Sequence, residues 1–296
     1  MTTSVGRRAV LAGVAGALGV GAGCASVVGE GAPVSMLVAG SLTNAVENGL
    51  RPATDRALRV EARGSAHAAR LVASGAKDPD VLSLADPALF DGLDADWHAA
   101  FATNALVLAY NADTPGGRRV ARADDWYRPL LRDDVRFGRT DPDLDPLGYR
   151  TLFALELATD HYDADIDLRD AIPSRDQLYP ETQLVSQFET GGIDAAITYR
   201  TMVHDRGYDY RPLPPAVNLS DPARADRYAR TTYELPDGTV VRGDVIRYAA
   251  TVRRSSPAVR ETFRRHVAGD YLSAFGFGVP DGYPRFTPHA PDELAH

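Results

Sequence analysis

The chain alternates short apolar runs with amphipathic segments, and this alternation restricts its fold more than any other feature. Residues 34–38 and 81–84 are apolar runs of strand length, and residues 58–62 are expected to form a further strand; each is followed by a segment expected to be helical. Glycine and serine stand together at the first two junctions, as Gly40-Ser41 and Gly64-Ser65. A repeat of strand, turn and helix predicts a parallel α/β sheet. Ligands of such sheets bind at the carboxyl ends of the strands, where the next helices begin.

The rest of the chain continues the pattern. We expect further strands at residues 105–110, 137–140, 193–199 and 245–252, and helices after Asp145-Pro146, over 183–190 and over 257–275. Residues 111–126 are rich in Asp, Gly and Arg, which predicts a loop, and the proline-rich residues 211–222 are expected to form a return connection. A length of 296 residues predicts two domains, or one domain divided into two lobes.

Charge and residue usage exclude several classes of function. The chain has 40 acidic and 32 basic residues and a net charge of -8, which argues against broad nucleic-acid binding. Cys24 is the single cysteine, so neither an intramolecular disulfide nor a multi-cysteine metal site is possible. None of the seven histidines is paired at a zinc-binding spacing. We predict no metal site and no cofactor.

The first 24 residues are typical of an export signal. Arg7-Arg8 is a twin-arginine pair, and the uncharged residues 9–22 would span only about 21 Å as a helix, against about 30 Å for a bilayer core. Small residues precede Cys24, as at a lipoprotein cleavage site. We therefore predict a signal over 1–24, a tether over 25–33, export by the twin-arginine route, and lipid anchoring through Cys24 on the outer face of the cytoplasmic membrane.

Each Gly-Ser turn has two interpretations. A serine at the start of a helix commonly caps the free backbone N–H groups. The same N–H groups, a hydroxyl and the helix dipole also make an anion site. Two such turns in successive units favour an anion site built around Ser41 and Ser65. Asp145 stands before Pro146, and an Asp in that position is a favoured helix cap.

Several motifs resemble one known family. They are Ala39-Gly40-Ser41-Leu42, Gly64-Ser65 with Ala69-Arg70, the segments 80–86, 102–104, 192–194, 213–215 and 218–220, Tyr199-Arg200, and above all the stretch 138–150, which reads GRTDPDLDPLGYR. Together they resemble the tungstate/molybdate-binding proteins of ABC importers, especially the archaeal-type tungstate binders, over nearly all of residues 34–280. The resemblance implies a two-lobed type II periplasmic-binding-protein fold with a ligand cleft between the lobes. It implies lobe 1 at 34–105 and 234–296, lobe 2 at 106–233, and a hinge at 105–110 and near 243–252.

The resemblance also implies site residues. In the archaeal-type family two carboxylates approach the metal centre of the oxyanion; Asp145 matches one, and Thr198 stands where the other is a glutamate. This departure favours a tetrahedral anion held by hydrogen bonds over six-coordinate binding. The predicted ligand contacts are Ser41 and Ser65, followed by Asp145, Tyr149 and Thr198.

These observations predict a solute-binding protein of an ABC importer. It would capture a tetrahedral oxyanion, with tungstate or molybdate as the leading candidate, and deliver it to the permease and ATPase subunits. The protein would act as a membrane-anchored monomer. One alternative is another oxyanion, sulfate or phosphate, after the loss of a ligand carboxylate. The other is an exported enzyme acting on an oxyanion or phosphoester through Asp145 and His67. The absence of a Gly-x-Ser-x-Gly elbow or another nucleophile–base motif favours binding over catalysis.

Overall fold

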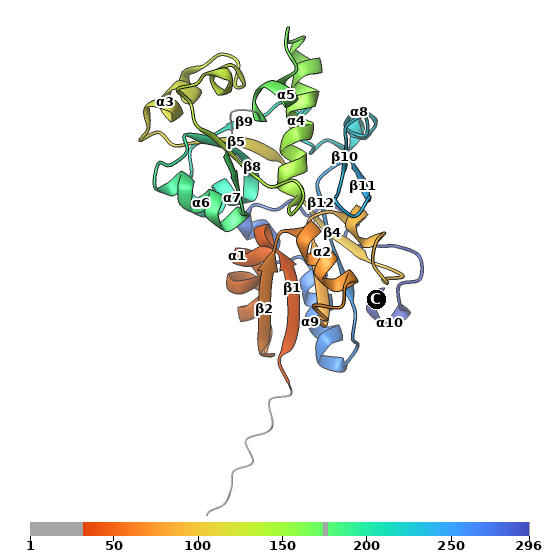
Figure 1. Cartoon of the computed structure of the whole chain (residues 1–296). Helices are drawn as coiled ribbons and strands as arrows, with labels where there is room; N and C mark the ends of the chain where they lie inside the picture. The colour runs from red at the N-terminus through yellow and green to blue at the C-terminus, as the bar shows by residue number, and fades with distance from the viewer. Residues whose placement is uncertain (1–31, 174–176, 296) are drawn as a thin grey trace, which may run out of the picture. The chain divides into compact units, whose positions relative to one another are not determined.

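The computed structural model describes residues 32–173 and 177–295 (Figure 1). The predicted signal, Cys24 and residues 25–31 of the predicted tether lie outside these residues. Within the described part of the chain, no helix is long and apolar enough to cross a membrane.

The first sheet has six strands in the order β13-β4-β12-β3-β1-β2. Its strands are β1 (Val34–Ala39), β2 (Leu58–Arg63), β3 (Val81–Leu84), β4 (Ala99–Thr103), β12 (Arg247–Val252) and β13 (Arg285–Phe286). Strand β1 pairs in parallel with β2 and β3, whereas β12 runs antiparallel to β3 and β4. All six residues of β1 are buried, as expected for a central strand covered on both faces.

The second sheet has five strands in the order β7-β6-β8-β5-β9. Its strands are β5 (Leu106–Tyr110), β6 (Phe137–Thr140), β7 (Gln177–Tyr179), β8 (Ala195–Tyr199) and β9 (Tyr210–Pro212). Strand β6 is parallel to β7 and β8, and β5 is antiparallel to β8 and β9. The prediction of parallel sheets is thus confirmed for the strand–turn–helix units. It is wrong for β5 and β12, because each of these strands follows a passage of the chain from one sheet to the other.

Helices cover both sheets. Their bounds are α1 (Thr43–Ala45), α2 (Ser65–Ala73), α3 (Pro115–Arg122), α4 (Pro146–Tyr162), α5 (Leu168–Ala171), α6 (Glu181–Glu189), α7 (Arg200–Arg206), α8 (Ala225–Tyr228), α9 (Pro257–Ala268) and α10 (Asp292–Ala295). Short 3-10 turns span Gly40–Leu42, Arg51–Ala53, Pro87–Phe90, Arg128–Leu131, Pro222–Arg224 and Leu272–Phe275, and a π-helical turn spans Val46–Leu50. A hairpin of β10 (Thr232–Glu234) and β11 (Val240–Arg242) lies outside the two main sheets.

Two expectations about helices were wrong. Residues 111–126 contain helix α3, which begins at the Thr114 cap and Pro115. The composition predicted a loop because Gly116 and Gly117 are uncommon in helices. Gly116 lies against the Asp194 carboxylate, where a Cβ would come within 2.4 Å of Oδ2. The helix expected over 257–275 ends at Ala268, because Gly269 takes the left-handed conformation with φ 73°.

The chain crosses between the two sheets at two residues. It leaves the first sheet after β4 and enters the second at β5, through Asn104 and Ala105. The return connection passes beside this crossing, since Leu106 N–H donates to the Asn218 carbonyl and Ile246 N–H donates to the Leu219 carbonyl. The α/β fold with two lobes is therefore confirmed, with one sheet in each lobe.

Candidate functional site

Helix α2 begins without a side-chain cap. Gly64 occupies the capping position, so Ser65 is the first helical residue rather than the cap. The Ser65 side chain is buried, and its Oγ accepts a hydrogen bond of 2.9 Å from the Ala85 N–H at the end of β3. The alternative interpretation of Ser65 as a helix cap is therefore wrong for this turn. Among the residues that the structure describes, no acceptor bonds the N–H groups of Ser65 and Ala66.

Ser41 lies in the 3-10 turn that follows β1, and it does not cap a helix either. Its Oγ is 3.0 Å from the hydroxyl oxygen of Tyr248 on β12. The Asn104 side-chain amide at the crossing donates to the same Tyr248 oxygen over 3.1 Å. Ser41 is thus linked through Tyr248 to Asn104, where the chain passes from one lobe to the other.

Helix α4 begins with a complete cap. Asp145 has extended backbone angles, its Oδ1 accepts a hydrogen bond of 2.7 Å from the Leu147 N–H, and Pro146 fills the first helical position. The capping interpretation of Asp145 is confirmed for this oxygen. Its role as a ligand contact stays a prediction.

The starts of α2 and α4 meet across the two lobes. The His67 N–H, in the first turn of α2, donates over 3.0 Å to the Leu144 carbonyl just before the α4 cap. Arg70 on α2 donates to the Asp143 carbonyl over 2.6 Å. A Cβ on Gly64 would lie 2.4 Å from the Leu144 carbonyl oxygen, so a glycine is required at this approach. Because the positive ends of both helix dipoles converge here, the junction favours an anion.

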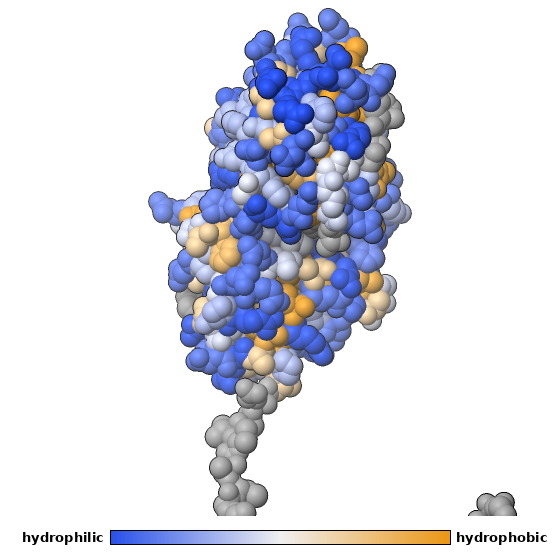
Figure 2. All heavy atoms as spheres, turned by 90° about the vertical axis from the view of Figure 1, so that its left-hand side faces the viewer, coloured by the Kyte–Doolittle hydropathy of each residue, from blue (hydrophilic) through white to orange (hydrophobic). Residues whose placement is uncertain are grey.

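A cavity of about 660 Å³ opens beside this junction, and residues of both lobes line it. Ser41 and Gly64 contribute from the first lobe, and Met202 from the second. The four charged lining residues, Glu47, Arg63, Asp205 and Arg206, balance in sign. Most of the face shown in Figure 2 is hydrophilic, with apolar residues in small groups.

The remaining two predicted contacts already have partners inside the protein. Thr198 is buried on β8, and its Oγ1 donates to the Met202 thioether sulfur over 3.0 Å. A thioether is a weak acceptor, so the Thr198 hydroxyl would give up only a weak hydrogen bond if it turned to a stronger acceptor. The Tyr149 hydroxyl donates over 2.6 Å to Asp86 Oδ2, and both groups are buried. Burial, followed by the Asp86 charge, raises the pKa of Tyr149 well above 10, so this hydroxyl stays protonated.

The structure adds two residues that the sequence did not identify as functional. Arg150 is buried beside Tyr149 and donates over 2.9 Å to the Tyr199 hydroxyl. Its guanidinium also lies 3.3 Å from Asp86 Oδ2. Arg150 ends the GRTDPDLDPLGYR stretch, and Asp86 ends the motif at 80–86, but nothing in the sequence showed that they meet. Within residues 32–173 and 177–295, no group of three or more His, Cys, Asp or Glu side chains could hold a metal ion.

Comparisons with known proteins identify relatives over most of the chain. The sequence profile of the bacterial extracellular solute-binding protein family matches residues 35–269. A Haloferax volcanii protein, provisionally named an ABC transporter molybdenum-binding protein, is 51% identical over 292 residues, covering 96% of this chain and 95% of that protein. The molybdate/tungstate-binding protein of Pyrococcus abyssi is 29% identical over 226 residues, covering 67% of this chain and 65% of that protein.

Solved structures share the fold at low sequence identity. The periplasmic molybdate-binding protein of Azotobacter vinelandii has a TM-score of 0.58 at 16% identity, covering 84% of this chain and 100% of that one. The sulfate-binding protein of Mycobacterium tuberculosis has a TM-score of 0.56 at 16% identity, covering 84% of this chain and 88% of that one. The chain therefore belongs to the bacterial extracellular solute-binding protein family and has its two-lobed α/β fold.

Proposed function

We propose that this protein is the extracytoplasmic binding component of an ABC importer and that it captures a tetrahedral oxyanion. Molybdate or tungstate is the leading candidate. Two relatives named for molybdenum or for molybdate/tungstate binding support the choice of ligand. The protein would bind one anion, close its lobes and pass the anion to a permease driven by its ATPase. It would bind without turnover, as a transport protein and not an enzyme.

The observation that carries this proposal is the start of α2. Its Ser65 and Ala66 amides have no protein acceptor among the described residues, and they belong to the turn that approaches the start of a second helix, α4. Each hydrogen bond to a charged group contributes about 1.5–3 kcal/mol. Five or six such bonds total roughly the 12 kcal/mol of a nanomolar complex, before the costs of closure. Neutral donors therefore suffice to hold the anion.

The proposed contacts differ in what they supply. Ser65 accepts from Ala85 through its oxygen, which leaves its hydroxyl proton available to the anion. Ser41 lines the cavity and would supply a second hydroxyl, and Thr198 would supply a third by turning from Met202, which also lines the cavity. Asp145 is proposed to approach the metal centre, as the family resemblance implies. A carboxylate 4 Å from a dianion would otherwise cost about 8 kcal/mol at an effective dielectric constant near 20.

The lobes and the anchor complete the proposal. Residues 34–105 with 234–296 form lobe 1, residues 106–233 form lobe 2, and residues 105–110 act as the hinge together with the segment near 243–252. Residues 1–24 direct export by the twin-arginine route, and lipid on Cys24 holds the monomer at the membrane. Replacing Cys24 by Ala is expected to release the exported protein from the membrane fraction.

Calorimetry tests the proposal directly. Molybdate, tungstate, sulfate and phosphate are titrated in turn into residues 25–296. We expect one site with tight binding of molybdate and tungstate and at least 100-fold weaker binding of the other two. Tight binding of sulfate or phosphate instead would show that Thr198, in place of a carboxylate, has changed the ligand. Binding of none of the four would contradict the proposed function.

A further inference from the structure

A buried contact joins the two lobes next to the predicted anion contact Ser65, because Asp86 follows Ala85, whose N–H donates to Ser65 Oγ. Asp86 follows β3 of the first sheet, whereas Tyr149 and Arg150 lie on α4, which packs against the second sheet. Asp86 Oδ2 accepts a hydrogen bond of 2.6 Å from the Tyr149 hydroxyl and lies 3.3 Å from an Arg150 guanidinium nitrogen. Asp86 Oδ1 accepts from the Ala88 N–H over 3.1 Å. Both carboxylate oxygens therefore have partners: those of Oδ2 lie in the other lobe, and that of Oδ1 lies in the same lobe as Asp86.

Because the three groups are buried, their contact favours the arrangement in which the two lobes are close together. The side chains of Arg150 and Asp86 are 5% and 11% exposed, and Tyr149 is completely buried. Charges held away from water interact more strongly than at the surface, and each is costly to leave unpaired there. The three groups gain this contact only when α4 and the β3 end are brought together. If the lobes separate, water must replace the partners that each group has in the other lobe.

The contact is also connected to the anion site. Arg150 donates to Tyr199 at the end of β8, and α4 itself begins at Asp145, next to Gly64 of α2. The same helix therefore carries a proposed ligand residue at its first turn and the Asp86 partners in its next residues. A movement that brings Asp145 to the ligand also brings Tyr149 and Arg150 to Asp86.

We propose that Asp86 is a positioning residue for ligand retention: its contact with Tyr149 and Arg150 is a latch that forms on closure and slows release of the anion. This inference rests on the proposed function, because it assumes that closure encloses the ligand. Asp86 is not among the residues that line the cavity of about 660 Å³. The latch therefore affects how long any bound anion is held, whichever oxyanion that is.

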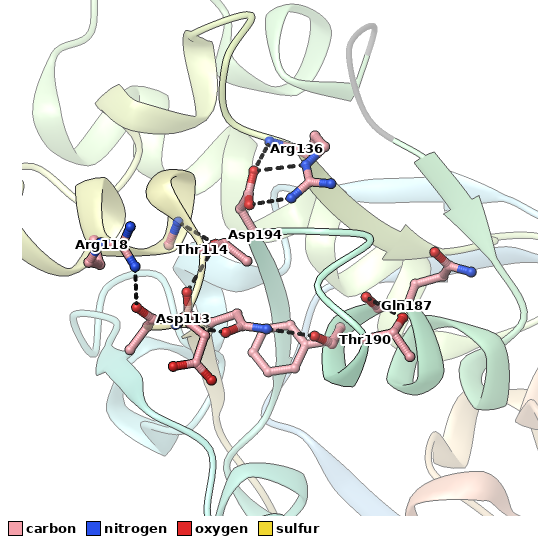
Figure 3. Close-up of polar contacts among 11 residues, drawn as sticks. Asp113, Thr114, Arg118, Arg136, Gln187, Thr190 and Asp194 are labelled. Atoms are coloured by element: carbon pink, nitrogen blue, oxygen red, sulfur yellow. Dashed lines mark hydrogen bonds and ion pairs between the residues drawn. The ribbon is translucent and has the colours of Figure 1, made fainter.

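Asp194 provides a matched control within one lobe. Its buried carboxylate bonds the Arg136 backbone N–H over 2.7 Å and the Arg136 guanidinium over 2.7 Å (Figure 3). Both residues flank strands of the second sheet, so the pair contributes to the fold of that lobe and crosses no lobe boundary. Asp86→Asn and Asp194→Asn each remove one paired, buried charge. They differ in whether the lost pair joins the two lobes.

The test measures molybdate release by stopped flow in the purified protein. Asp86→Asn is expected to speed dissociation about 5- to 150-fold, the usual range for coupling between sites, with association changed less than about threefold. Asp194→Asn is expected to leave both rates near those of the wild type. Equal dissociation rates in the wild type and Asp86→Asn, or equal effects of the two variants, would overturn the latch.

A milder variant and a second readout keep the test decisive. Tyr149→Phe removes only the hydroxyl, so it serves if Asp86→Asn does not fold. In the double variant, a latch predicts that the effects of Asp86→Asn and Tyr149→Phe are not additive, whereas a direct ligand contact by Tyr149 predicts additive effects. Small-angle scattering without ligand should show a larger radius of gyration for Asp86→Asn than for Asp194→Asn. If the wild type binds no oxyanion, the proposed function fails, and an unchanged radius would overturn the latch separately.

Discussion

Helices α2 and α4 begin at the same junction, one from each lobe, but their first turns are satisfied in opposite ways. At α4, the Asp145 side chain bonds the Leu147 N–H, and Pro146 has no N–H to satisfy. At α2, Gly64 offers no side chain, and the Ser65 hydroxyl oxygen is turned to the Ala85 N–H of β3. One helix start is closed by its own sequence, and the other is left open to an external acceptor.

This difference supports the proposal that α2 begins at a ligand site and that the start of α4 is structural. The four N–H groups at any helix start need partners. Where the chain supplies a cap, the helix dipole is already partly compensated; where it does not, the free N–H groups favour an anion from solution. A serine next to a helix start therefore indicates a cap or a ligand site only when its own partner is known.

The largest expected effect tests the open start together with its neighbour. Ser41→Ala with Ser65→Ala removes two hydroxyls, and at about 1.5–3 kcal/mol for each bond to a charged group the loss is about 3–6 kcal/mol of binding free energy. Calorimetry with molybdate measures it. Ser65→Ala also leaves the buried Ala85 N–H unpaired, which should cost about 1–3 kcal/mol of unfolding free energy. Ser65→Thr is the control that keeps a hydroxyl; affinity unchanged in the double variant would contradict the site.

The next effect tests the approach of the two helix starts. Gly64→Ala is compatible with the backbone angles of φ −55° and ψ 133°, but its Cβ would lie 2.4 Å from the Leu144 carbonyl of the other lobe. We expect a melting temperature close to that of the wild type and roughly 100-fold weaker molybdate binding, or about 2.8 kcal/mol.

Gly148→Ala on α4 is the counterpart of this variant. Its Cβ would lie 2.5 Å from the Pro142 backbone nitrogen in the same lobe, so thermal unfolding should detect a loss of stability. If Gly64→Ala lowered the melting temperature as much as Gly148→Ala, the α2 start would be a structural helix start like that of α4.

A smaller effect tests the closed start. Asn caps helices as well as Asp, so Asp145→Asn should keep the unfolding free energy within a few tenths of a kcal/mol, whereas Asp145→Ala should lose about 1 kcal/mol. If the carboxylate approaches the metal centre, Asp145→Asn weakens molybdate binding by about tenfold, or ~1.4 kcal/mol. Tighter binding would instead mean that Asp145 only caps α4 and repels the anion.

The smallest effect concerns pH. Burial, and then the charges of Arg70 and Arg63, hold the pKa of His67 on α2 below 6.5. His67 is therefore neutral at pH 7 and above, and molybdate affinity should change less than about twofold between pH 7 and 9, as in His67→Gln. Because the unfolded state binds this proton more readily, the contribution of His67 to stability is complete above pH 6.5 and is lost as the pH falls below that value. A steep fall in affinity from pH 7 to 9 would reveal a titrating cation at the α2 start.

The sequence predicted local elements well where each pattern was self-contained. Strand β3 lies at the predicted residues, and the Asp145-Pro146 start of α4 is as predicted, because capping and strand length depend on neighbouring residues. Helix α3 was missed, because two of its residues are glycines, of which Gly116 fits against Asp194, a residue far along the chain. Strand β4 was not predicted either, and its partners β12 and β13 come from the far end of the chain.

The sequence by itself determined the strand–turn–helix units, the family resemblance and the residues that stand at the helix starts, since these follow from local periodicity and motif. Only the tertiary structure decided which partner each polar group takes. Ser65 bonds β3 rather than capping α2, Tyr149 bonds Asp86 across the lobes, and Gly64 meets the Leu144 carbonyl. The physical reason is that a hydrogen bond or a close approach depends on distance in space, and these partners are 20 to 80 residues apart in the chain.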